Sequence, residues 1–581
     1  MRFLLLFLIL FITSCARFFI NAHEKRPRKD YSAQSHHAMV VSAHPIASQI
    51  GSQILKEGGN AIDAAIATSF AISVLRPQST GIGGGGFMLV YKPENPVVAY
   101  DFRERAPKKA SYKMYINTNN QVREVLYNNQ VIKNPSVNGH LAVGTPGLIA
   151  GLLKAHADHG TLELKKLIMP AIKLAQEGFL VYSDLAHACE DRKEILSKFE
   201  DSRRIFLPNQ ACIKEGQWLI QKDLAWTLQQ IANHGLKGFY EGPVSEKILA
   251  EIAAGHGILT HEDLKSYEVK IRMPLEASYR EHRIVSMPPP SSGGVHIIEM
   301  LNILSHFDLK SLGHDNPKTM HILAETMKRA FADRACYLGD PDFVKIPLKK
   351  LLSPEHAAKI AASISLSKAT PSLELSHIEE FYPNESPSTT HISVVDKSGM
   401  AVSTTQTINY AFGSGVVARG TGIVLNDEMD DFSIKPGIPN IYGLVGNNAN
   451  AIAAKKTMLS SMSPTLVFDP AGKLKLVAGS PGGPRIINAT LQTIINIIDH
   501  NMSLSDAVHS FRIHHQWLPD IINIEPHGLT LRQSRELKKL GHEFKIMQHI
   551  GDVQAIYLKH KNNYLELTGV SDTRSNGKPA Y

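Results

Sequence analysis

The chain has 581 residues, of which 43% are hydrophobic and 20% are charged, and its formal net charge is +8. This composition is typical of a globular protein with ample apolar material for a large core, and it allows several domains or one large layered enzyme. Because the lysines and arginines are spread along the chain apart from one short cluster near the start, the charge does not indicate a nucleic-acid-binding protein.

Residues 1–22 are typical of an export signal. Arg2 is followed by an unbroken apolar run of about eleven residues and then by small residues. The run is too short for a membrane-spanning helix, which needs about 20 residues. Its end, Ile12 to Cys15, resembles the lipobox of bacterial lipoproteins and predicts a lipid anchor on Cys15. Ordinary cleavage near Ala22 is the alternative, and it would leave a free periplasmic protein.

Three further cysteines follow, Cys189, Cys212 and Cys336. In an exported protein an odd number predicts either one disulfide with one buried thiol or no disulfide, and Cys189 and Cys212 are the closer pair. The sequence contains no CxxC and no HExxH, so it does not indicate a structural zinc site or a zinc protease.

The segment 44–75 predicts two helices separated by Gly58 and Gly59, with Asn60 as the N-cap of the second. The glycine run 81–86 that follows satisfies G-x-G-x-x-G. A dinucleotide site needs this pattern between a strand and a following helix, whereas here a helix precedes it and a strand follows. We therefore interpret the glycines as a tight backbone turn.

In the rest of the chain the predicted secondary structure changes at residue 389, from mainly helices to mainly strands and turns. Residues 145–255 predict mainly helices, 286–304 predict a rigid turn feeding an apolar helix, and 364–388 form a Ser/Pro/Glu-rich connection that we expect to be exposed and cleavable. From residue 389 onward strands and turns dominate, with one long helix from 486 to 499. This order predicts stacked sheets covered by helices in a layered protein.

Thr389 opens a β-branched strand directly after that connection. No G-x-S-x-G window exists, and none of the cysteines has surroundings that would activate a thiol. A threonine at a chain terminus carries its own base, the α-amine, whose pKa is about 7.7–8.0. Taken alone, Ser-Pro-Ser-Thr-Thr is also an ordinary turn before a strand, so the downstream segments decide between the two interpretations.

Those segments closely resemble γ-glutamyltranspeptidase, an N-terminal-nucleophile hydrolase, over nearly all of the chain after residue 22. The resemblance is carried by "GGNAIDAAIA", "TGIGGGGFM", "DFRERAP", "VGTPG", "PPPSSGG", "TTHISVVD", "DEMDDFS", "NIYGLVG", "LSSMSPT", "GSPGGPRI", "FRIHHQWLPD" and "GVSDTRS". It implies an α+β fold, a four-layer αββα sandwich, and a precursor that cleaves itself between Ser388 and Thr389. Residues 23–388 would form the large subunit and 389–581 the small, catalytic one.

The resemblance also implies a role for individual residues. The family substrate is a γ-glutamyl amide such as glutathione, whose head is zwitterionic, so its pocket needs a cation for the α-carboxylate and acceptors for the α-ammonium. The matching positions are Thr389 as nucleophile, Thr407 as its supporting hydroxyl, Gly482 and Gly483 as oxyanion donors, Arg103, Ser460 and Ser461 for the carboxylate, Asn409, Glu428 and Asp431 for the ammonium, and Tyr442 in a lid.

Two positions depart from or vary within the family pattern. Position 428, which is either Gln or Glu in the family, is Glu here, and Pro484 follows the glycine pair where Ser or Thr is commoner. Without the resemblance, Arg103 and Glu104 would be interpreted as a surface ion pair and "DEMDD" as a solvated acidic loop.

The sequence therefore predicts an exported, self-cleaving γ-glutamyltransferase and glutathione hydrolase that needs no metal or cofactor. Its expected partners are small substrates, including amino-acid or peptide acceptors, and the two subunits of one precursor. We expect no nucleic acid, and a membrane only through the lipid anchor. A glutaryl (cephalosporin) acylase is the rival enzyme, with less need for Glu428 and Asp431. A non-catalytic envelope binding protein is the rival of another class.

Overall fold

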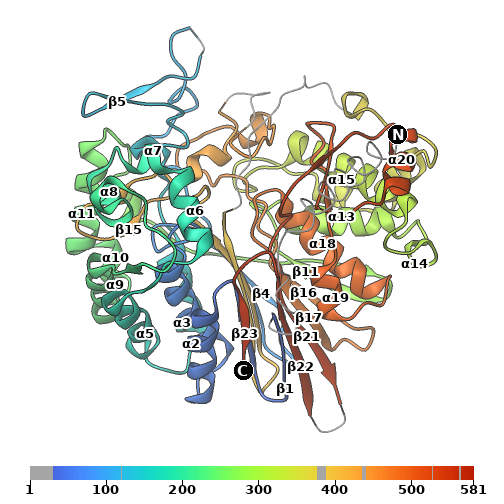
Figure 1. Ribbon diagram of the computed structural model, residues 1–581, viewed down its shortest axis with the longest axis horizontal. Helices are drawn as coiled ribbons and strands as arrows, with labels where there is room; N and C mark the ends of the chain where they lie inside the picture. Colours follow the sequence, from blue (N-terminus) through green and yellow to red (C-terminus); the bar gives the residue numbers. More distant parts are fainter. Residues whose placement is uncertain (1–30, 120, 376–387, 435–439, 527, 562–563) are drawn as a thin grey trace, which may run out of the picture.

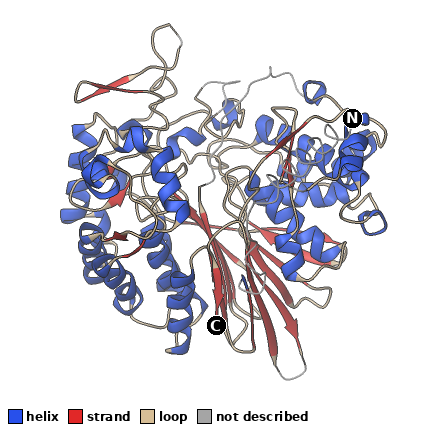
Figure 2. Cartoon of the chain, viewed as in Figure 1, coloured by secondary structure: helices blue, strands red, loops and turns tan. Residues whose placement is uncertain are grey.

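Two seven-stranded antiparallel sheets, packed face to face, form the centre of the protein (Figures 1 and 2). The computed structural model describes residues 31–119, 121–375, 388–434, 440–526, 528–561 and 564–581. The export signal and Cys15 lie outside the described residues. Among the described helices none is both long and apolar enough to cross a membrane.

The first sheet has, in order, β23 (Lys578–Ala580), β2 (Met39–Ser42), β12 (Thr390–Val395), β13 (Ala401–Thr407), β3 (Gly85–Tyr91), β4 (Val98–Phe102) and β9 (Lys270–Arg272). The second has β1 (Ser32–Ser35), β22 (Leu565–Ser571), β21 (Gln554–His560), β17 (Leu474–Gly479), β16 (Thr465–Phe468), β11 (His282–Ser286) and β10 (Leu275–Tyr279). Because both sheets are antiparallel, the layered protein is of the α+β class.

Helices cover the outer face of each sheet (Figure 1). Those on the first sheet are α2 (Pro45–Lys56), α3 (Ala61–Leu75), α4 (Leu148–His159), α5 (Leu164–Glu177), α6 (Ser183–Asp191), α7 (Lys193–Leu196), α8 (Glu200–Phe206), α9 (Lys222–His234), α10 (Lys237–Tyr240), α11 (Gly242–Ala254) and α12 (His261–Lys265). Those on the second are α13 (Gly293–Leu304), α14 (Leu309–Leu312), α15 (Pro317–Tyr337), α16 (Leu348–Leu351), α17 (Pro354–Ser363), α18 (Arg485–Ile498), α19 (Leu504–His509) and α20 (Leu531–Lys539).

Short strands complete the described structure. They are the pairs β5 (Val125–Tyr127) with β6 (Gln130–Ile132), β7 (Phe179–Leu180) with β8 (Trp218–Leu219) and β14 (Val417–Ala418) with β15 (Ile423–Val424), and the set β18 (Ile513–His514), β19 (Ile522–Ile524) and β20 (Phe544–Ile546). The β5–β6 hairpin projects from the body of the molecule in Figure 1.

Strand β12 lies near the middle of the first sheet, between β2 and β13. All six of its residues are buried, because one face packs on the helices and the other on the second sheet. A strand covered on both faces favours apolar and small side chains, and "THISVV" is such a run apart from His391, whose ring is hydrogen-bonded to Thr405 and Ser393. This position places the residue before the strand, Thr389, deep in the molecule.

Residues before and after position 389 are interleaved in both sheets. In the first sheet β12 pairs with β2 on one side and β13 pairs with β3 on the other. In the second sheet β16 pairs with β11, and β22 pairs with β1. The two segments thus share one core, and a cut at residue 388 would leave every one of these pairings in place.

The local sequence predictions for 44–91 are confirmed. Asn60 caps α3 with a capping box formed with Asp63. The glycine run makes a turn, closed by Gly84 N–H donating to Gly81 O at 3.0 Å, and leads directly into β3. A Cβ on Gly84 would lie 1.9 Å from the carbonyl oxygen of Thr407. The glycines therefore permit close packing behind β13.

Cys189 and Cys212 are both free thiols, so the described structure has no disulfide between this closer pair. Burial raises the pKa of the Cys189 and Cys212 thiols, which makes both poor nucleophiles. A hydroxyl group is therefore the better candidate for the nucleophile.

Candidate active site

Thr389 and Thr407 meet at the edge of the first sheet where β12 begins and β13 ends. Their hydroxyl oxygens are 3.1 Å apart. The Thr407 hydroxyl also accepts a hydrogen bond from the Asn409 backbone N–H at 2.8 Å. Antiparallel pairing of β12 with β13 produces this contact, since Thr390 lies opposite Gln406. The strand register thus gives Thr389 a hydroxyl neighbour that is itself held in place.

The backbone at Thr389 is strained. Its φ is +102°, a conformation that a β-branched residue rarely adopts and that costs on the order of 1–3 kcal/mol. Its N–H donates to the carbonyl oxygen of Ser79 at 3.1 Å. The carbonyl of Ser388, on the other side of the same peptide bond, accepts a hydrogen bond from the Gly482 N–H at 3.2 Å. The bond predicted to break is therefore both strained and polarised.

Gly482 and Gly483 immediately precede α18. Their φ values are +125° and +57°, which only glycine adopts without strain. A Cβ on Gly483 would also lie 2.8 Å from the Tyr442 ring. Pro484 is the N-cap residue of α18 and continues the turn. The glycine turn thus brings the Gly482 N–H to the carbonyl of Ser388, close to a helix N-terminus, where the partial charge is positive.

Arg103 lies in a buried cluster of carboxylates. Its guanidinium is 2.5 Å from Glu428, 2.5 Å from Asp431 and 3.4 Å from Glu104. Arg103 and Glu428 are almost fully buried, so neither the surface ion pair nor the solvated acidic loop describes these residues. The Nε of Arg103 and the Oε1 of Glu428 have no hydrogen-bond partner among the described residues.

Burial raises the pKa of all three carboxyls around Arg103, to about 8 for Glu104. Burial lowers and the carboxylates raise the pKa of the Arg103 guanidinium, and the net effect is upward. One guanidinium faces three carboxyl groups, so it compensates only part of their charge, and the raised pKa values favour protons on the remaining carboxyls. An added ammonium group would supply a second cation in place of those protons.

These residues line a small cavity of about 20 Å³, which we call the head pocket. Its lining includes Arg103, Arg334, Thr389, Thr407, Asn409, Asp431, Tyr442, Ser460, Ser461 and Gly483. The structure thus brings together most of the residues that the sequence singled out. Glu428 does not line the pocket itself but contacts Arg103, which does. Gly482 lies on the other side of Thr389.

Two residues of the pocket hold each other in place. The Tyr442 hydroxyl donates to the Asn409 carbonyl oxygen at 2.8 Å. The Asn409 side-chain amide donates to the Asp427 carbonyl oxygen at 3.1 Å. Tyr442 is buried beside Gly483, and it is a wall of the pocket in this structure. Part of the lid segment predicted from the sequence, residues 435–439, lies outside the described residues.

Arg334 is a pocket residue that the sequence analysis missed. It comes from α15, is 6% exposed, and donates to the hydroxyls of Ser292 at 3.0 Å and Ser461 at 3.4 Å. Burial lowers the pKa of its guanidinium to about 10, while the nearby Asp431 acts in the opposite direction. Nothing in the local sequence marks this arginine, because only the packing of α15 brings it beside Ser461.

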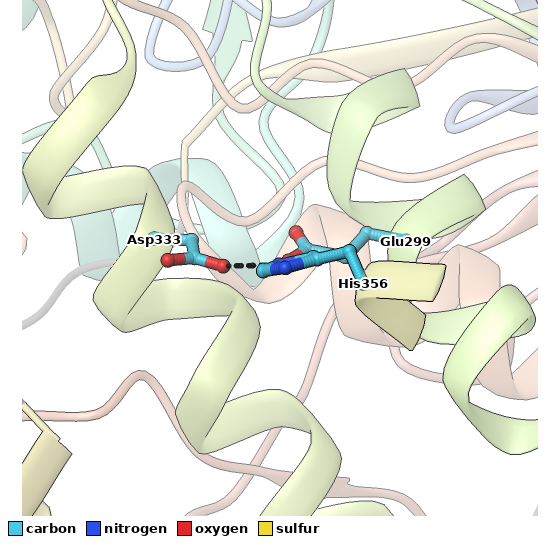
Figure 3. Close-up of side chains that lie close together, drawn as sticks. All are labelled: Glu299, Asp333 and His356. Atoms are coloured by element: carbon cyan, nitrogen blue, oxygen red, sulfur yellow. Dashed lines mark hydrogen bonds and ion pairs between the residues drawn. The ribbon is translucent and has the colours of Figure 1, made fainter. Parts of the chain in front are cut away.

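A separate cluster has the donor atoms that a metal ion would need. Glu299 of α13, Asp333 of α15 and His356 of α17 each offer one ligand atom, and these atoms lie within 4.8 Å of one another (Figure 3). His356 Nε2 is 3.1 Å from Asp333 and 3.6 Å from Glu299. None of the three lines the head pocket. The contacts tie together the helices around Arg334, which follows Asp333 in α15.

Comparison with known proteins identifies the family. The sequence profile described as Gamma-glutamyltranspeptidase matches residues 47–581. A glutathione hydrolase proenzyme of Escherichia coli (strain K12) is 44% identical over 541 residues, which cover 92% of this chain and 90% of that protein. An Acylase ACY 1 proenzyme of Pseudomonas sp. (strain V22) is 38% identical over 490 residues, which cover 84% of each chain.

Solved structures agree with this result. The crystal structure of a cephalosporin acylase from Bacillus halodurans matches with a TM-score of 0.83 at 26% identity, covering 96% of this chain and 98% of that one. The crystal structure of Helicobacter pylori gamma-glutamyltranspeptidase matches with a TM-score of 0.55 at 43% identity, covering 58% of this chain and 94% of that one.

Proposed function

Because this chain belongs to the gamma-glutamyltranspeptidase family of enzymes, we propose that it is a self-processing γ-glutamyltransferase and glutathione hydrolase. Thr389 is its nucleophile, first on its own chain and then on substrate. The observation that carries this proposal is the buried, cation-deficient carboxylate cluster around Arg103, in the same pocket as a threonine at the start of a core strand.

Self-cleavage starts from the geometry at Ser388. The Thr389 hydroxyl attacks the carbonyl carbon of Ser388, whose oxygen already accepts the Gly482 N–H. That hydrogen bond stabilises the developing oxyanion. The C–N bond then breaks to leave an ester on Thr389, and water hydrolyses this ester. Cleavage frees the α-amine of Thr389 and releases the backbone strain, because a chain-terminal residue has no preceding carbonyl to fix φ.

The same groups then act on a γ-glutamyl amide. The α-amine of Thr389 takes the hydroxyl proton, the hydroxyl oxygen attacks the γ-carbonyl, and the glycine N–H groups bind the oxyanion. Arg103, Ser460 and Ser461 bind the α-carboxylate, while Asn409, Glu428 and Asp431 accept from the α-ammonium. The Thr389 α-ammonium then gives the hydroxyl proton to the amide nitrogen, the bond from the γ-carbon to that nitrogen breaks, and the amine leaves an ester on Thr389. Water or an amino-acid amine takes the glutamyl group from this ester.

A glutaryl acylase is the second candidate, since curated relatives include acylases. The glutaryl group is a γ-glutamyl group without its ammonium. Three carboxyls around one arginine favour a substrate that brings a cation, which supports the γ-glutamyl substrate.

The two candidates separate in one assay. We expect kcat/KM for γ-glutamyl-p-nitroanilide to exceed that for glutaryl-p-nitroanilide by roughly 100-fold or more, because the glutaryl group leaves buried carboxylates uncompensated. Equal values, or a preference for the glutaryl substrate, would favour the acylase. Release of p-nitroaniline from neither substrate would contradict both.

The mature protein is a heterodimer with the four-layer αββα sandwich of N-terminal-nucleophile hydrolases, made of residues 23–388 and 389–581. The pairing of strands from both segments in each sheet supports this, since the cut chains would remain interleaved. A denaturing gel of purified protein should show two bands, and N-terminal sequencing of the smaller should begin at Thr389. A single band from active protein would contradict the proposal.

The protein is exported to the bacterial envelope, either as a free periplasmic enzyme or through a lipid on Cys15. The apolar run before Cys15 supports export. Incorporation of labelled palmitate that is lost in Cys15→Ala would identify the anchored form, and a mature N-terminus at His23 would identify the free form. A retained Met1 would contradict export.

A further inference from the structure

A second cavity opens on the other side of Thr389. It has a volume of about 210 Å³, roughly ten times that of the head pocket, and we call it the amine-side cavity. Thr389 is the residue that lines both. Ser388 and Gly482 also line the amine-side cavity, so it reaches the carbonyl at which both reactions take place. The residue roles proposed above give this cavity no ligand.

Arg76 is a buried cation in this cavity. It is 7% exposed. Its guanidinium donates to the Ala43 carbonyl oxygen at 3.2 Å and to the Ser79 hydroxyl at 3.3 Å, and its Nε has no hydrogen-bond partner in the described part of the chain. Among the described residues no carboxylate lies within 4.0 Å of it. A buried arginine is normally paired with an anion, so Arg76 is poised for one from outside the chain.

Asp552 is a buried anion in the same cavity. It is 7% exposed. Its Oδ1 accepts from the Gln554 amide at 2.7 Å and from the Ser575 hydroxyl at 2.8 Å, which fixes the carboxylate. Its Oδ2 is buried and has no hydrogen-bond partner among the residues that the structure describes. Burial, together with the neighbouring Asp572, raises the pKa of Asp552 to about 7.

Arg76 is linked to the reacting atoms through one residue, and Asp552 lines the same cavity as those atoms. Arg76 donates to the side chain of Ser79, whose carbonyl oxygen accepts the Thr389 N–H. Asp552 follows Gly551, and a Cβ on Gly482 would lie 3.4 Å from the Gly551 Cα. Arg76 and Asp552 therefore line one cavity beside Thr389 without an ion pair between them, which leaves room for a ligand that carries both charges. The other titratable groups among the described residues that line it are Asp184, His187, Asp191, His549 and Arg574, and Arg574 is already paired with Glu525 and Asp572.

We propose that the amine-side cavity binds the amine half of the reaction, an α-amino acid or dipeptide with a free carboxylate, with Arg76 binding the carboxylate and Asp552 the amino group. This inference rests on the proposed γ-glutamyl transfer. It adds the cavity and the two residues that would hold the acceptor and the leaving group. Cys-Gly from glutathione belongs to this class, and so does a free amino acid or dipeptide.

Asp552 also has a chemical role in transfer. A free acceptor carries an ammonium group, which has no lone pair for attack. The ammonium gives one proton to the Asp552 carboxylate, and the neutral amine attacks the carbonyl carbon of the γ-glutamyl ester. The bond from that carbon to the Thr389 oxygen breaks, and the oxygen recovers its proton from the attacking nitrogen through the Thr389 α-amine. A pKa near 7 suits this exchange.

The test compares two acceptors that differ only in the carboxylate, glycylglycine and glycylglycinamide, with γ-glutamyl-p-nitroanilide as donor. We expect the cleaved wild-type enzyme to have a KM for glycylglycine at least tenfold below that for the amide. Arg76→Met should bring this ratio close to one, and Arg76→Lys should restore part of it. Arg532→Met, a matched change at an exposed arginine of α20, should leave the ratio as it is.

Asp552→Asn is a second, nearly isosteric test. It still tests the proposed acceptor site if the Arg76→Met chain does not cleave itself. At a fixed glycylglycine concentration the ratio of transfer to hydrolysis should fall at least tenfold, and the pH dependence of transfer near pH 7 should flatten. An unchanged ratio, or an equal loss for both acceptors in Arg76→Met, would overturn the proposal. A wild-type enzyme inactive on the donor would instead overturn the proposed function.

Discussion

The two cavities that meet at Thr389 hold their charges in opposite ways. In the head pocket Arg103 already contacts three carboxyl groups, whereas in the amine-side cavity Arg76 and Asp552 share a space without contact. A compact, preformed cluster selects a ligand that fits its charge pattern. Separated charges instead favour a ligand that carries both a positive and a negative group and can contact each of them. The difference indicates a selective donor side and a roomier acceptor side.

Thr389→Ala removes the residue that the two cavities share, and its effect should be the largest. We expect one uncleaved, inactive chain, because alanine has no hydroxyl for either attack. Thr389→Ser should still cleave, more slowly, since serine lacks the methyl that restricts χ1. A denaturing gel and a p-nitroaniline assay measure both outcomes. Thr390→Ala is the neighbouring control and should be processed; its failure alone would place the nucleophile one residue later.

Arg103→Ala tests the head pocket. We expect KM for γ-glutamyl-p-nitroanilide to rise about 100-fold or more, because the substrate carboxylate loses its cation and three buried carboxyls lose theirs. Self-cleavage should proceed, since Arg103 has no hydrogen bond to Ser388 or Thr389. Arg103→Lys, which keeps the charge, should have a smaller effect. A KM within about threefold of the parent value would show that Arg103 does not bind substrate.

Thr407→Val tests the hydroxyl group that lies beside the nucleophile in the head pocket. Valine keeps the shape of threonine but removes the hydroxyl 3.1 Å from the nucleophile. We expect kcat to fall about tenfold with KM nearly unchanged, and Thr407→Ser to recover most of the loss. Single-turnover measurement of p-nitroaniline release separates this effect from binding. A change confined to KM would assign Thr407 to substrate binding instead.

The smallest effect concerns stability. Burial raises the pKa of Glu104 to about 8 and that of Asp552 to about 7, so the folded state holds protons that the unfolded state has lost. Such groups contribute stability at acidic pH, and this stability is lost as the pH rises toward the folded-state pKa. In the uncleaved Thr389→Ala chain, Tm should therefore decline between about pH 5 and pH 8.

Two further variants show which cavity causes that decline. Glu104→Gln should flatten it through the head pocket, and Asp552→Asn through the amine-side cavity. Circular dichroism melts at several pH values measure each slope. If both variants kept the slope of Thr389→Ala alone, the pKa shifts of these two residues would not be its source.

Local chemistry made much of the fold predictable. The Asn60 cap, the two helices at 44–75, the strand after Thr389 and the turn at the glycine run all depend on neighbours in sequence, and the structure confirms them. The resemblance in ordered motifs identified the pocket residues before any geometry was known. Residue type and spacing alone would have interpreted Glu428 and Asp431 as a solvated loop.

The sequence by itself predicted the family, which the comparisons confirm, and it singled out Thr389 and most of the residues that line the head pocket, because each lies in a short motif of adjacent residues. Only the tertiary structure decided that Arg334 lies beside Ser461, that the Gly482 N–H reaches the Ser388 carbonyl, and that Arg76 and Asp552 face one cavity. These contacts join residues far apart in the chain. They depend on how the sheets and helices pack, and the propensity of a local segment carries no information about its distant neighbours.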